Sequence, residues 1–165
     1  MRTLVTIGVY CWTPEGFLDA LREAGVALVL DVRQRRGVRG PEYAWANSQR
    51  LQAALAEAGI GYRHHPELAP TTELRQLQYR EDDRLGVGKR SRSELAPEYR
   101  ARFLREILSQ VDLDPIVEEL PPDAASALLC VERDPEACHR SLIAGRLAGD
   151  FGLPVLHLRP EARAG

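Results

Sequence analysis

The chain has 165 residues, of which 44% are hydrophobic and 28% are charged, and its formal net charge is −2. This length fits one ordinary domain, and the composition is typical of globular proteins and argues against wholesale disorder. No stretch approaches the ~20 consecutive apolar residues of a bilayer span, so we expect no membrane partner. The slightly acidic balance excludes a global attraction for nucleic acid, and the irregularly spaced cysteines favour a reduced, cytoplasmic protein over a disulfide framework.

The first half of the chain alternates between predicted strands and predicted helices. Short β-rich or apolar runs predict strands over 3–9, 26–32 and 60–64. Between them, capping residues and helically spaced apolar residues predict helices over 13–25 and 47–59, each of which ends at a glycine.

Residues 66–96 interrupt this alternation. The segment is polar and charged, contains the basic cluster KRSR at 89–92 and lacks an apolar period, so we predict that it is irregular. Because it is longer than an ordinary connector, we expect either a mobile segment or a functional lid. The elements predicted after it are helices over 97–107, 115–120 and 134–152 and strands over 126–131 and 154–158.

The order of these elements predicts the fold class. Strands that alternate with helices require right-handed crossovers and a parallel sheet that is covered on both faces. We therefore predict one three-layer α/β/α domain over residues 1–165, with five mainly parallel strands in the order 3-2-1-4-5. In this order the first and fourth strands are neighbours at the switch point, where such sheets bind their ligands.

Three of the predicted strands end in residues that could form a site. Gly8 ends the first strand, Asp31 and Arg33 end the second, and Glu132 follows the fourth. Since the carboxyl ends of neighbouring parallel strands lie at one edge of a sheet, we expect Asp31, Arg33 and Glu132 to converge in one crevice. Gly8 is expected on its rim as a binding residue.

The turn after the fourth strand, residues 134–140, leads into a predicted helix. Unpaired backbone N–H groups at a helix N-terminus favour an anion. The same field, together with His139 and Arg140, would lower the pKa of Cys138 and make its sulfur more thiolate-like.

Four segments of the chain resemble one known family. They are TIG (6–8), DVR (31–33), GIGYRHHPEL (59–68) and LLCVERDPEACHR (128–140). They are similar to the motifs of the domain-of-unknown-function 488 (DUF488) family, and the similarity runs from about Arg2 to His157. The resemblance implies an α/β fold and no established activity. It also implies a site built from Asp31, Arg33, Glu132, Cys138, His139 and Arg140.

Most of these residues also have a purely structural interpretation. Cys130 follows two leucines in a buried strand, where a cysteine is more often core filler than a reactive group. Cys138 could pack under the helix or act as an activated thiol, and His139 could cap the turn or act in catalysis. Asp31 and Arg33 could form an ion pair that organises the strand ends, or they could contact a ligand.

The leading hypothesis is an enzyme-like pocket for an anionic small molecule or a nucleotide. Arg33 and Arg140 would hold the anion, and Glu132 or Asp31 would move protons. Cys138 with His139 would be the nucleophile or an orienting pair.

Two alternatives remain open at this point. The basic clusters at 33–39 and 84–92 could clamp phosphates in a nucleic-acid-binding module, with Tyr43, Trp45 and Tyr79 available for stacking on bases. The charged residues could instead form a buried polar network in a non-catalytic scaffold, which would leave no open crevice.

No cofactor and no metal are expected. The first strand is not followed by GxGxxG, and GVGKR at 86–90 lacks both the first glycine and the hydroxyl residue of a phosphate loop. A zinc site made of Cys130, Cys138 and His139 would lack the paired Cys-x-x-Cys spacing of ordinary zinc sites.

Overall fold

The structure, a computed structural model that describes residues 1–160, is built around one sheet in which all paired strands are parallel. The strands are β1 (Thr3–Ile7), β2 (Val26–Asp31), β3 (Gly61–His64), β4 (Ala125–Leu129) and β5 (Val155–His157). The predicted α/β class with five parallel strands is confirmed.

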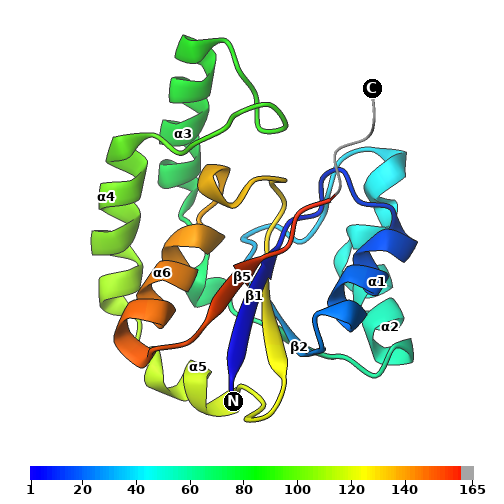
Figure 1. The fold of residues 1–165 in the computed structure, drawn as a ribbon. Helices are drawn as coiled ribbons and strands as arrows, with labels where there is room; N and C mark the ends of the chain where they lie inside the picture. Colours follow the sequence, from blue (N-terminus) through cyan, green and yellow to red (C-terminus); the bar gives the residue numbers. More distant parts are fainter. Residues whose placement is uncertain (161–165) are drawn as a thin grey trace.

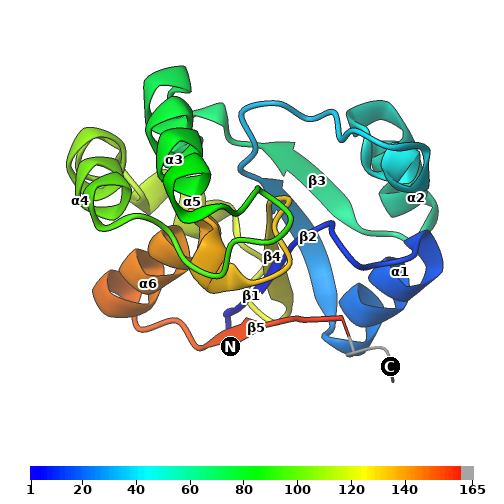
Figure 2. The same cartoon turned by 90° about the horizontal axis from the view of Figure 1, so that it is seen from above.

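Helices cover both faces of the sheet and make three layers (Figure 1). The helices are α1 (Pro14–Glu23), α2 (Ser48–Glu57), α3 (Thr72–Leu85), α4 (Pro97–Glu106), α5 (Asp114–Glu119) and α6 (Arg140–Phe151). Figure 2 shows α1 and α2 on one side of the sheet and α6, α3 and α4 on the other. Among residues 1–160, no helix has the length and apolar character needed to cross a membrane.

The strand order is β3-β2-β4-β1-β5, so the predicted order 3-2-1-4-5 is wrong because β1 and β4 exchange places. Every residue of β4 is buried, which suits the centre of a sheet that is covered on both faces. β1 and β4 are nevertheless neighbours, as predicted. The register places Leu129 between Asp31 of β2 and Ile7 of β1, so three strand ends meet at one place.

The predicted irregularity of 66–96 is also wrong, because α3 occupies the middle of that segment. The side chain of Thr71 caps the helix N-terminus, and Gly86 ends the helix in a left-handed conformation. The buried face of α3 contains Leu74 and Leu77 together with two polar residues, Gln78 and Asp82. The buried residues of α3 do recur at helical spacing, but two of the four are polar, so the segment shows no apolar period.

Candidate active site

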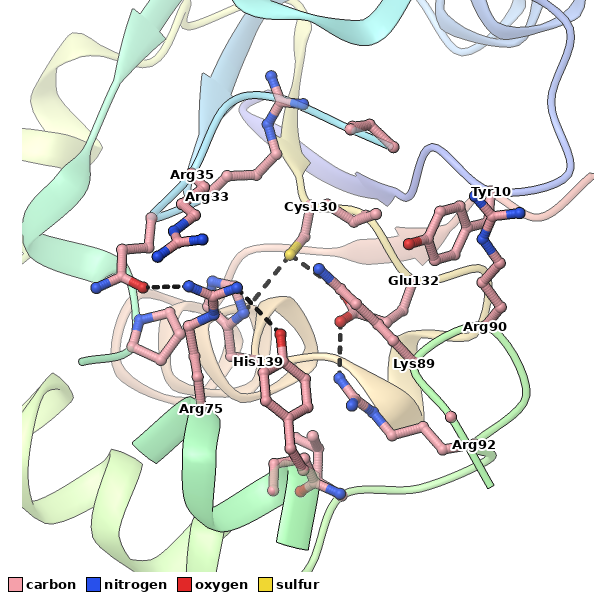
Figure 3. A pocket seen from close by; sticks show the side chains of 18 of the residues that line it. Tyr10, Arg33, Arg35, Arg75, Lys89, Arg90, Arg92, Cys130, Glu132 and His139 are labelled. Atoms are coloured by element: carbon pink, nitrogen blue, oxygen red, sulfur yellow. Dashed lines mark hydrogen bonds and ion pairs between the residues drawn. The ribbon is translucent and has the colours of Figure 1, made fainter. Parts of the chain in front are cut away.

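A cavity of about 710 Å³ opens at the carboxyl ends of β2 and β4 (Figure 3). Its floor is formed by residues 130–132, directly after β4, and by His139. Its walls come from the loop after β2, from α3 and from the loop that joins α3 to α4. The basic residues that line it are Arg33, Arg35, Arg39, Arg75, Lys89, Arg90 and Arg92.

The thiol on the cavity floor belongs to Cys130. Its Sγ lies 3.6 Å from His139 Nδ1 and 3.4 Å from Glu132 Oε2. The other ring nitrogen of His139, Nε2, lies 2.8 Å from the carbonyl oxygen of Val32. A carbonyl oxygen can only accept, so Nε2 carries a hydrogen atom and Nδ1 is the nitrogen that exchanges a proton with sulfur.

The second thiol, Cys138, lies behind the first. Cys138 has an extended backbone between the 3-10 segment η4 (Pro135–Ala137) and α6, so the helix begins later than the predicted residue 134. Its Sγ is 3.7 Å from the same Nδ1 atom of His139, but its side chain is buried and does not line the cavity. One imidazole nitrogen therefore faces both sulfur atoms.

The two thiols differ in acidity. Burial raises the pKa of Cys130, and the neighbouring Cys138 raises it further. Burial also acts to raise the pKa of Cys138, but a hydrogen bond from Cys130 and the charges of His139 and Arg140 outweigh burial and lower it well below its usual value. The surroundings therefore favour a negative charge on Cys138 over one on Cys130.

The pKa of His139 is raised, whereas that of Cys138 is lowered. Burial lowers this pKa, but the Cys138 thiolate and the bond to the Val32 carbonyl outweigh burial, so the pKa is raised. The ring is therefore suited to carry a positive charge between the two sulfur atoms.

Glu132 supplies a buried carboxyl group beside the thiols. Arg92 Nη2 donates to Glu132 Oε1 at 2.7 Å, and Arg92 Nη1 donates to Asp82 of α3 at 2.8 Å. Burial raises the pKa of Glu132, and the negative charge of Cys138 adds to this, while Lys89 and Arg92 oppose it. A carboxyl group with a raised pKa can deliver a proton closer to neutral pH than an exposed one.

Four cations of the cavity have no ion pair within residues 1–160, namely Arg35, Arg39, Arg75 and Lys89, and of these Arg75 donates to the neutral side chains of Gln34 and Tyr79. Lys89 is half-buried, and its amino group points toward Cys130 and Glu132 (Figure 3). Burial acts to lower the pKa of Lys89, but the negative charge of Glu132 and Cys130 raises it overall, so this amino group stays charged. Arg35 is exposed on the opposite wall.

Aromatic residues hold the loop that carries Lys89. The guanidinium group of Arg90 lies 5.1 Å from the ring centre of Tyr10 and 5.2 Å from that of Tyr43. Arg90 also forms an exposed ion pair with Glu42. The stack therefore connects the loop to the turn after β1.

The structure places Asp31 and Arg33 together as a buried ion pair. Arg33 Nε and Nη2 donate to the two carboxylate oxygens of Asp31 at 2.9 and 2.8 Å, and Nη1 donates to the carbonyl oxygen of Ala46. Tyr62 adds a hydrogen bond to Asp31 at 2.6 Å. Each guanidinium nitrogen of Arg33 has a protein acceptor, so the geometry supports the structural alternative for these two residues rather than contact with a ligand.

Arg140 is also occupied by the protein. Its guanidinium group donates to the carbonyl oxygens of Glu132 and Arg133 and to the hydroxyl of Thr6. Within the turn, the backbone N–H groups of Ala137 and Cys138 donate to carbonyl oxygens of the same turn. The geometry therefore favours Arg140 as the residue that fixes the path of the loop, and the anion expected at residues 134–140 stays a prediction.

Gly8 serves close packing of the backbone. A Cβ atom at this position would lie 1.8 Å from the carbonyl oxygen of Glu132. The backbone N–H groups of Val9 and Tyr10, which follow, both donate to the carbonyl oxygen of Val131. Gly8 thus allows the end of β1 to touch the loop that carries the site.

Among the aromatic residues considered for stacking on bases, Tyr79 lines the cavity, where Arg75 donates to its hydroxyl and lies over its ring. Tyr43 packs against Tyr10, and Trp45 packs against Phe17. Two of the three are therefore engaged with other aromatic rings of the protein.

Sequence reasoning missed the position of Cys130 at the cavity floor and the parts played by Lys89 and Arg92. A signal for Cys130 was present, because residues two apart on an extended chain point to the same side and Glu132 had been assigned to the site. The positions of Lys89 and Arg92 depend on how the loop after α3 folds, and no local pattern encodes that.

The same cluster contains the residues that could hold a metal ion. Cys130, Cys138 and His139 each offer one ligand atom, and these atoms lie within 4.8 Å of one another. Thiolate and imidazole are ordinary zinc ligands. From the sequence we expect no metal at these three residues, because their spacing has no Cys-x-x-Cys pair; the fold brings them together from a strand end and from a turn.

A comparison with known families agrees with the motifs. The family described as "Domain of unknown function DUF488" matches residues 13–147, which is most of the chain. The chain matches no curated protein and no solved structure.

Proposed function

The chain belongs to the DUF488 family, and from this premise we propose that it is an enzyme that binds a phosphate ester or nucleotide in the cavity and attacks it with Cys130. The observation that carries the proposal is the thiol–imidazole contact on the floor of a cavity with cationic walls, 3.6 Å between Cys130 Sγ and His139 Nδ1. A nucleophile within reach of a base that a third group orients is the arrangement that covalent catalysis requires. The buried-scaffold alternative, by contrast, expects no open crevice.

The cavity recognises a negative charge through Lys89 and Arg35. Neither has an ion pair within the described chain, so neither must give up a partner to bind an anion. Since the Lys89 amino group points toward Cys130, an anionic group held there lies against the sulfur atom. A bound phosphoryl group is thereby placed for attack.

The proton of Cys130 passes to another residue of the same cluster. The Cys138 thiolate, stabilised by the imidazolium of His139, accepts this proton as the Cys130 sulfur attacks phosphorus. The S–P bond forms and the P–O bond to the leaving alcohol breaks, and the alcohol takes its proton from the carboxylic acid of Glu132. Water then gives a proton to the Glu132 carboxylate and attacks phosphorus. The S–P bond breaks and Cys138 returns its proton to the Cys130 sulfur, which restores the thiol and releases phosphate.

The experiment measures hydrolysis of p-nitrophenyl phosphate and of nucleoside monophosphates by the full chain and by two cysteine variants. Cys130→Ser is expected to lower kcat/KM by about 10³-fold or more, because the serine hydroxyl is not activated at this site. Cys11→Ser is the matched control, since Cys11 is exposed and does not line the cavity. Full turnover by Cys130→Ser, or no turnover by the wild-type protein with any of these substrates, would contradict the proposal.

A variant of the cavity wall separates binding from chemistry. Lys89→Met is expected to raise KM by about tenfold or more, because one charge-assisted contact with phosphate is removed. Arg84→Met offers a control of the same charge change, since Arg84 is exposed and pairs with Glu81 away from the cavity.

A further inference from the structure

Two buried thiols share one imidazole nitrogen at the end of β4. We infer that Cys130 and Cys138 form an intramolecular disulfide when a hydroperoxide enters the cavity, so that this pair is a reversible oxidation site. The inference does not require the proposed hydrolysis, because it concerns only the two sulfur atoms and their access to a small oxidant.

The two sulfur atoms lie near each other in the fold. The Sγ atoms of Cys130 and Cys138 lie within 4.8 Å of each other, and both are within 3.7 Å of His139 Nδ1. A disulfide needs an S–S separation of about 2.0 Å, so closure requires a side-chain rotation and a small backbone movement. Cys138 lies in an extended link between η4 and α6, and Cys130 follows the last residue of β4, so neither is held inside a helix or strand.

Access differs between the two thiols and sets the order of events. Both thiols are buried, with exposed fractions of 5% for Cys130 and 1% for Cys138, but only Cys130 lines the cavity, which a small oxidant can enter. The oxidant therefore meets Cys130 first, and Cys138 is the resolving thiol. A reactive cysteine with a second cysteine beside it is the usual arrangement of reversible thiol oxidation.

The chemistry balances with one hydroperoxide. The Cys130 sulfur attacks the terminal oxygen of the hydroperoxide, an S–O bond forms and the O–O bond breaks. The alcohol, or water from hydrogen peroxide, leaves with the proton that Cys130 gives up. The Cys138 sulfur then attacks the sulfenic acid sulfur of Cys130, the S–S bond forms and the S–O bond breaks. Hydroxide leaves as water with the proton of the His139 imidazolium, so the two sulfur atoms lose two electrons and one hydroperoxide gains them.

The experiment exposes the full chain carrying Cys11→Ser to one equivalent of hydrogen peroxide and then digests it with trypsin without reduction. Arg133 lies between the two cysteines, so trypsin places them on separate peptides unless a disulfide joins them. The expected result is a linked pair of peptides whose mass is two hydrogen atoms below the sum of the free peptides. Dithiothreitol should separate the pair.

Two variants in the same background assign the roles. In Cys138→Ser, Cys130 should accumulate sulfenic acid that dimedone traps, and no linked peptide should form. In Cys130→Ser, oxidation of Cys138 should be slower by on the order of tenfold or more, since the accessible thiol is gone.

Three results would overturn the inference. They are two thiols that stay reduced under peroxide, oxidation that joins only separate molecules, and a stoichiometric metal ion that binds both sulfur atoms and blocks their reaction. None of these readouts depends on turnover, so failure of the disulfide and failure of the proposed hydrolysis are distinguishable.

Discussion

At the scale of single residues, Gly8 and Glu132 show how backbone contact and burial shape the site. The end of β1 touches the loop after β4 because Gly8 has no side chain, and this contact holds Glu132 at the cavity floor. Burial then gives the Glu132 carboxyl group its raised pKa.

Gly8→Ala should destabilise the protein. The added Cβ would lie 1.8 Å from the carbonyl oxygen of Glu132, so the two backbone segments must separate. We expect a loss of about 1–3 kcal/mol in the free energy of unfolding, measured by urea denaturation. Gly149→Ala is the control: this glycine lies within α6 with nothing within 4 Å of an added Cβ, so alanine there should leave stability unchanged or raise it. Equal effects of the two substitutions would contradict the close approach at Gly8.

Glu132 should make stability depend on pH. Its folded pKa lies above the unfolded value of 4.5, so its favourable contribution is complete below pH 4.5 and is lost as pH rises through the folded pKa. The free energy of unfolding of the wild type minus that of Glu132→Gln should therefore fall as pH rises above 4.5. Urea denaturation of both proteins across a pH series measures this difference, and a flat or rising difference would show that the carboxyl pKa is not raised.

At the scale of elements, the sequence predicts where the strands lie along the chain better than it predicts their order in the sheet. Each strand is a local apolar run, whereas the choice of β4 for the centre depends on how all the strands pack together. Helix α3 was missed because two polar residues, Gln78 and Asp82, occupy its buried face. They bond to each other, and their other partners, Arg92 and the Ala96 N–H, lie outside the helix on the segment that follows it. The strand-end residues of the site could be predicted because the local apolar runs show where each strand ends. Lys89 could not be predicted as a site residue, because it lies on the loop after α3.

Asp82→Asn should loosen the loop between α3 and α4. The substitution removes one of the two carboxylates that hold the buried Arg92, and it leaves Glu132 as the other. We expect a loss of about 1–3 kcal/mol in the free energy of unfolding and faster amide hydrogen exchange over 87–96. Asp83→Asn on the same helix changes the same charge at an exposed side chain and should leave exchange in the loop unaltered. Unchanged exchange in Asp82→Asn would mean that the ion pair does not hold the loop.

At the scale of the whole molecule, the charge of the cavity lining is opposite in sign to the net charge of the chain. The chain is acidic overall, yet basic residues from three segments, the loop after β2, helix α3 and the loop from α3 to α4, line one cavity. Attraction for an anion is therefore local, and low-dielectric walls strengthen it at the position of Cys130. The sheet makes this possible because the parallel strand ends bring residue 31, residue 130 and the turn after Gly8 to one edge.

The most direct test of the account is the alkylation of Cys130 by iodoacetamide in the native protein, followed by mass spectrometry at increasing concentrations of inorganic phosphate. The account predicts that Cys130 is alkylated while Cys138 is not. It also predicts that phosphate slows the reaction at Cys130 and leaves the rate at the exposed Cys11 unchanged. Alkylation of Cys130 at a rate that phosphate does not alter, or a Cys130 that reacts only after unfolding, would contradict a thiol nucleophile in an anion-binding cavity.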